Sequence, residues 1–131
     1  MTSKDLRYYD ERYPVCRMEF AQKSWVTDEG HAAKTDTLNE INMLIERIDI
    51  LISEVTGNPT VTVTITDHNS VQLVSFAALA DGTKHIKLAT SDATDFDALP
   101  VSGDLTVSID PSADPGGVAQ TLTVDVIIYG R

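Results

Sequence analysis

The sequence predicts an α+β fold: an N-terminal extended arm, one amphipathic coiled-coil-like helix, and a C-terminal small antiparallel β-sandwich or partial barrel. Three observations lead to this prediction. Residues 1–35 show no sustained hydrophobic period, residues 36–57 carry apolar residues at helical spacing, and residues 58–131 alternate apolar with polar residues between turn signals. We therefore divide the 131-residue chain into an arm (1–35), an oligomerisation helix (36–57) and a β-sandwich domain (58–131).

The predicted arm mixes aromatic with charged residues and holds five of the eight aromatic residues of the chain. Pro14 interrupts any helix in its first half. Because Tyr, Trp and Arg are enriched in binding surfaces, we expect the arm to bind a partner. The expected partner-binding residues are Arg7, Tyr8, Tyr9, Arg12, Tyr13, Phe20 and Trp25. The alternative is that these aromatic side chains pack on the chain's own sheet.

The predicted helix carries apolar residues spaced three, four, three, four and three apart, which is the a/d pattern of a coiled coil. Isoleucine at both a and d positions favours trimers. The expected trimer interface is Leu38, Ile41, Ile45, Ile48, Ile52 and Val55. Met43, Leu44, Ile50 and Leu51 widen the apolar surface beyond a seam, so the alternative is an ordinary helix that covers the sheet of a monomer.

The C-terminal half alternates apolar and polar residues in several short runs. Strands are expected at 60–66, 71–79, 84–90, 105–109 and 121–129, with a hairpin turn at Asp81–Gly82 and loops at 91–103 and 110–117. In the last strand Ile127 and Tyr129 make the second face apolar too, so both faces are expected to be buried, one of them at a subunit contact. A β domain of about 70 residues with no disulfide has a thin core, which is a second reason to expect oligomers.

Charge and composition exclude several classes of function. Acidic residues outnumber basic ones 20 to 10, and the net charge of −10 disfavours partners that present phosphates, namely nucleic acid and anionic membranes. No apolar run is long enough to span a membrane, and the N-terminus has no apolar signal sequence. The single cysteine, Cys16, cannot form an internal disulfide, which suits a protein made in the cytoplasm.

No motif in the sequence indicates catalysis. A nucleophile elbow, a phosphate-binding loop and paired metal-ligand spacings are all absent, and His31, His68 and His85 lie far apart. The acidic loop 91–97 is the best candidate for a Ca²⁺ site, followed by Asp110 and Asp114, but aspartates in turns already have a local hydrogen-bonding reason to be there. We therefore expect no enzyme activity, no cofactor and no bound metal.

The Thr/Val/Asp-rich strands at Thr60–Thr66 and Thr121–Tyr129, with their Pro/Asp/Gly loops, resemble small structural proteins of tailed-bacteriophage virions. The similarity is to capsid decoration (cement) proteins and to tail or fibre modules. It implies a non-enzymatic homotrimer, assembled in the host cytoplasm, that stabilises the shell by binding the major capsid protein or another virion protein through its N-terminal arm.

Three other functions stay open at this point. The first is a tail, neck or fibre component. The second is a carbohydrate- or receptor-binding module that uses the loops 91–103 and 110–118, although Phe96 is their only aromatic residue. The third is a small hydrolase that uses loop aspartates and His85, for which a domain of this size has little room to form a pocket.

Overall fold

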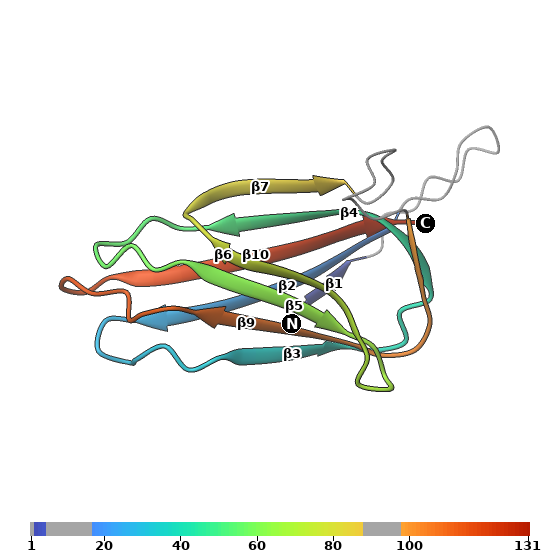
Figure 1. Cartoon of the computed structure of the whole chain (residues 1–131), viewed down its shortest axis with the longest axis horizontal. Coiled ribbons are helices and arrows are strands. Elements are labelled where there is room, and N and C mark those ends of the chain that lie inside the picture. The colour runs from blue at the N-terminus through green and yellow to red at the C-terminus, as the bar shows by residue number, and fades with distance from the viewer. Residues whose placement is uncertain (1, 5–16, 88–97) are drawn as a thin grey trace.

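Ten β-strands build the part of the chain that the computed structural model describes, namely residues 2–4, 17–87 and 98–131. They form two antiparallel sheets packed as a sandwich (Figure 1). The strands of the six-stranded sheet are β1 (Thr2–Lys4), β2 (Arg17–Val26), β10 (Thr121–Gly130), β4 (Met43–Ile52), β7 (Gly82–Lys87) and β8 (Leu99–Val101). The strands of the four-stranded sheet are β3 (Lys34–Leu38), β9 (Leu105–Pro111), β5 (Val61–Thr66) and β6 (Gln72–Leu79).

The order within each sheet interleaves distant parts of the sequence. The six-stranded sheet runs β1-β2-β10-β4-β7, with β8 beside the start of β4, and the four-stranded sheet runs β3-β9-β5-β6. Each sheet therefore draws strands from both halves of the chain. Figure 1 shows the strands along the long axis of the molecule, so their connections gather at its two ends.

The helix predicted over residues 36–57 is wrong, because the described residues contain no helix. This stretch forms the end of β3, a short connection and β4. A β-bulge explains the misleading spacing. Tyr129 of β10 pairs with Arg47, but the next residue, Gly130, pairs with Ile45, which leaves Glu46 as an extra residue in β4. The inward-facing positions therefore step by three from Ile45 to Ile48, and this step imitates a helical interval.

The six residues expected at a coiled-coil seam are all buried in the chain's own core. Leu38, Ile41, Ile45, Ile48, Ile52 and Val55 are each at most 7% exposed. No helical seam exists for a trimer, so any contact between copies must use other side chains.

The second half of the predicted arm is also part of the sandwich. Strand β2 lies inside the six-stranded sheet, and all ten of its residues pair with β10. Its inward positions are partly polar: Glu19 is 1% exposed and lies 3.3 Å from Arg17. Lys23 reaches across to Asp36 of β3 at 3.1 Å, which links the two sheets. Because these inner-face residues are charged, the sequence of β2 does not show the alternation of apolar and polar residues that predicts a strand.

The strands expected in the C-terminal half are largely confirmed. Strands β5, β6, β9 and β10 match the expected ranges to within two residues. The hairpin at Asp81–Gly82 is wrong, because β6 and β7 belong to different sheets. The core is larger than expected, since β2, β3 and β4 supply buried residues as well. A small core is therefore no longer a reason to expect oligomers.

Candidate interaction face

The two sheets turn very different side chains outward. On the four-stranded sheet, the residues that alternate with the buried ones are short and hydroxylated, and we call this surface the hydroxyl face. Its members are Thr35, Thr37, Thr62, Thr64, Thr66, Ser75, Thr106 and Ser108. Such a surface is the usual solvent-facing side of an antiparallel sheet.

The outer side of the six-stranded sheet is apolar over part of its area. We call this part the apolar face, and its members are Met18, Phe20, Leu51, Ile127 and Tyr129, all half-buried. Directly opposite residues on neighbouring strands share a face. Register places Phe20 opposite Ile127 and Met18 opposite Tyr129, so β2 and β10 build one continuous apolar surface.

An arginine held by two contacts stands beside this surface on β4. The Arg47 guanidinium lies 4.1 Å from the centroid of the Tyr129 ring, and its Nε lies 3.2 Å from Oδ1 of Asp49. The Asp49 side chain is 7% exposed, whereas that of Arg47 is 43% exposed. The ion pair and the ring thus fix Arg47 in place while its outer edge stays accessible. The arrangement is suited to binding a partner.

The residues expected in the partner-binding arm do not lie together. Phe20 belongs to the apolar face, but Trp25 is 1% exposed in the core, because an odd separation along a strand puts two side chains on opposite faces. Trp25 donates a hydrogen bond from Nε1 to the carbonyl of Ala32 at 2.8 Å. The remaining arm residues, Arg7, Tyr8, Tyr9, Arg12 and Tyr13, lie outside the described residues.

Sequence reasoning found part of the apolar face and missed the rest. Ile127 and Tyr129 gave a signal, because the last strand is apolar on alternate positions of both faces. Leu51, Arg47 and Asp49 lay inside the predicted helix, so they could not be assigned to this surface. Only the pairing of β4 with β10 brings them beside Tyr129.

No protein-family model matches this chain, and no curated protein matches it. Among solved structures it is similar to infectious bursal disease virus, with 12% identity and a TM-score of 0.42 for the Gt strain and 11% and 0.43 for the Gx strain. The VP2 subviral particle of that virus gives 12% identity and a TM-score of 0.37. Each match covers 98% of this chain but only 41% or 42% of the other.

At these identities and TM-scores the likeness supports no conclusion about the family or role of this chain. It does not point to tailed bacteriophages in particular, and no function follows from it. The chain spans about two fifths of the length of the chains that it matches.

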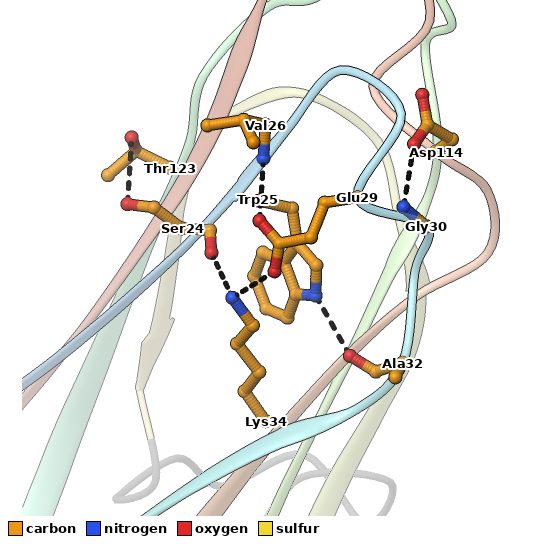
Figure 2. Close-up of polar contacts among 9 residues, drawn as sticks. All are labelled: Ser24, Trp25, Val26, Glu29, Gly30, Ala32, Lys34, Asp114 and Thr123. Atoms are coloured by element: carbon orange, nitrogen blue, oxygen red, sulfur yellow. Dashed lines mark hydrogen bonds and ion pairs between the residues drawn. The ribbon is translucent and has the colours of Figure 1, made fainter.

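The loops at one end of the sandwich are tied together by polar contacts, and Figure 2 shows several of them. The Asp114 carboxylate accepts hydrogen bonds from the backbone N–H of Gly116 at 2.8 Å and of Gly30 at 2.9 Å. The Nζ atom of Lys34 lies 2.5 Å from Oε2 of Glu29 and 5.0 Å from the centroid of the Trp25 ring. We call the connections 27–33, 53–60, 80–81 and 112–120 the loop end.

Two open depressions flank Gln120 at the loop end. One, of about 400 Å³, is lined by Val26, Val118 and their neighbours, and the other, of about 520 Å³, is lined by Glu54, Asp81 and their neighbours. No aromatic side chain lines either. The two loops expected to form a carbohydrate- or receptor-binding surface lie apart. The described part of 91–103 lies beside the start of β4, whereas 110–118 lies at the opposite end of the sandwich.

Neither a metal-ligand cluster nor a membrane-spanning helix is found in the described ranges. No three His, Cys, Asp or Glu side chains there gather closely enough to hold a metal ion, and no helix there could span a membrane. The acidic run 91–97 lies outside the described residues. Asp114 is engaged by backbone N–H groups, and His31 and His68 lie at opposite ends of the sandwich.

Acid is expected to destabilise the loop end. The N–H groups of Gly116 and Gly30 lower the pKa of Asp114 below its usual 3.8, and a hydrogen bond from Lys34 lowers the pKa of Glu29 below 4.5. A lowered folded-state pKa adds stability that is present above the unfolded-state value and is lost as the pH falls through the folded-state value. The melting temperature should therefore fall between about pH 5 and pH 2.

The Asp114→Asn variant tests this expectation by thermal melts at both ends of that pH range. It should melt lower than the parent at neutral pH and lose less melting temperature on acidification. The control is Asp110→Asn at an exposed position of β9, which should change neither. An Asp114→Asn variant with the parent's full acid sensitivity would remove Asp114 as a cause.

Proposed function

We propose that this protein is a non-enzymatic structural component of a virus particle, which acts by binding neighbouring proteins. In its finer form the proposal is a homotrimeric capsid decoration protein of a tailed bacteriophage, bound to the major capsid protein or another virion protein. It binds neither nucleic acid nor membrane. The strand composition at Thr60–Thr66 and Thr121–Tyr129 supports this class of protein, since it resembles that of such virion proteins.

The apolar face is the observation that carries the proposal. The inner faces of a two-layer sandwich already build its core, so large apolar side chains on an outer face serve something outside the chain. Aromatic residues, Met and Arg are the types enriched in protein interfaces, and Phe20, Tyr129, Met18 and Arg47 are all found here. In this proposal the apolar face binds the shell and the hydroxyl face meets solvent.

The arm can add to this contact because the described residues that flank positions 5–16 lie next to the apolar face. Lys4 of β1 pairs with Met18, and Arg17 is the next residue before it. Residues 5–16, which include Arg7, Tyr8, Tyr9, Arg12 and Tyr13, connect these two positions in the sequence. We propose that they extend the contact to the same partner.

Binding to purified particles of the virus that encodes this chain tests the proposal. The parent chain should co-sediment with them, and the double variant Phe20→Thr/Ile127→Thr should bind at least about tenfold more weakly, because two large apolar contacts are lost. Threonine keeps a high preference for strands. The matched control is Thr64→Ala/Ser108→Ala on the hydroxyl face, which should bind as the parent does.

Equal binding by the two double variants would rule out the apolar face as the contact surface. Absence of binding by the parent chain would count against the virion role itself. The oligomeric state is measured separately, by light scattering at several concentrations. A mass three times 14.3 kDa supports the homotrimer, and a monomer at every concentration removes the homotrimer from the proposal.

A further inference from the structure

The N-terminal strand is joined to the rest of the sandwich by an unusually long connection. β1 (Thr2–Lys4) pairs antiparallel with Met18–Phe20 of β2, so the two strands form a hairpin. Twelve residues, 5–16, connect them. Hairpin connections usually contain about two to five residues. A connection of twelve residues is not needed to form this pairing within one chain.

β1 also contributes little to the sandwich to which it is attached. It makes three residue pairs with β2, whereas β10 pairs with β2 over ten. It lies at the edge of the six-stranded sheet. The same three pairs form whichever copy of the chain supplies β1, so exchanging it between copies conserves the contacts.

We propose that β1 is exchanged between adjacent copies of this chain, so that Thr2–Lys4 of one copy pairs with Met18–Phe20 of the next. The proposal rests on the assembly role proposed above, which brings copies together. Twelve residues span up to about 40 Å, enough to reach the β2 edge of a neighbouring sandwich. The occupant is a second copy because every copy carries the strand that already fits this edge in register. Three such exchanges, each from one copy to the next, close a ring of three copies. This ring would hold a homotrimer together without a coiled-coil helix.

The test uses cysteines at a pair of residues that face each other across β1 and β2, in a chain whose native Cys16 is replaced by serine. One variant carries Lys4→Cys and the other Met18→Cys. The two are mixed, unfolded in urea, refolded together at high concentration and oxidised. Exchange should give a disulfide-linked species of twice 14.3 kDa on a non-reducing gel. Without exchange, cysteines on different chains meet only by collision. Collision also links two chains of the same variant, so each variant refolded alone gives this background.

A second pair in the same sheet controls for random collisions. Gln22 of β2 and Asp125 of β10 are paired directly, and their side chains lie 2.6 Å apart on the outer face. A mixture of Gln22→Cys and Asp125→Cys chains should give little linked product, because β10 is held by ten pairs. The expected result is at least about five times more linked product from the β1 mixture, well beyond what collisions alone allow.

Equal amounts of linked product from the two mixtures would overturn the exchange. The double variant Lys4→Cys/Met18→Cys in one chain shows whether the pair can form a disulfide at all. If it forms none, β1 does not pair with β2 as described, and the proposal also fails. Particle binding and native mass are measured on the parent chain, so exchange can fail while the virion role stands.

Discussion

Replacing Ile50 with alanine is expected to lower the free energy of unfolding by about 2–5 kcal/mol, the usual cost of removing a large aliphatic side chain from a core. Ile50 lies in the middle of β4 and is 0% exposed. It pairs with Val126 on one side and with Lys84 on the other, so the strand that carries it is held at both edges. Urea unfolding followed through the emission of Trp25, the only tryptophan, measures the loss.

The matched control for Ile50 is the next residue. Leu51 belongs to the half-buried apolar face, so Leu51→Ala is expected to cost only about 1 kcal/mol. In a coiled-coil helix over 36–57, both positions would lie outside the a/d seam and would respond alike. Equal and small losses in the two variants would therefore contradict the burial of Ile50 between the sheets.

Burial in this region could be predicted from the sequence, but the secondary structure could not. All six a/d residues are buried, as the spacing indicated. Ile50 was the informative exception, because a helix puts it off the seam whereas a strand puts it on the same face as Ile48 and Ile52. The bulge opposite Tyr129 then supplied a step of three that no strand pattern contains.

The other strands differed in how clearly their sequences predicted them. Strand β5 alternates Val and Ile with Thr, so it was predicted almost to the residue. Strand β2 has Glu19 and Lys23 on its inner side, balanced by Arg17 of the same strand and by Asp36 of β3 respectively. A single sequence does not reveal such pairing, because Asp36 becomes the partner of Lys23 only when the two sheets pack.

The sequence predicted apolar residues of the candidate site within single strands, but not which strands lie side by side to form one surface. Apolar residues on both sides of the last strand indicated a second apolar surface, and Ile127 and Tyr129 lie on an outer face, where both are half-buried. The extent of that surface depends on the order β2-β10-β4, which joins strands about a hundred and about eighty residues apart in sequence. Hydrophobic periodicity does not contain this order, so Arg47 and Asp49 could not be assigned to the surface from the sequence.

Replacing Trp25 with alanine is expected to cost about 3–5 kcal/mol of folding free energy, the largest single loss proposed for this protein. The indole is 1% exposed, and its Nε1 donates to the carbonyl of Ala32 at 2.8 Å. Lys34 lies over the ring at 5.0 Å and bonds to Glu29, so the ring also supports contacts of the loop end. Urea unfolding followed by circular dichroism gives the loss, since the variant has no tryptophan emission.

Two further variants separate the causes of that loss. Trp25→Phe keeps an aromatic ring in the core but leaves the carbonyl of Ala32 without this donor, so it should lose less than Trp25→Ala. Val26→Ala changes the next residue, which is 49% exposed, and should alter stability by less than about 0.5 kcal/mol. If Trp25 were instead a partner-binding residue of an extended arm, Trp25→Ala would leave unfolding unchanged and weaken only particle binding. That outcome would place the indole outside the core, and the stability measurement alone distinguishes the two roles.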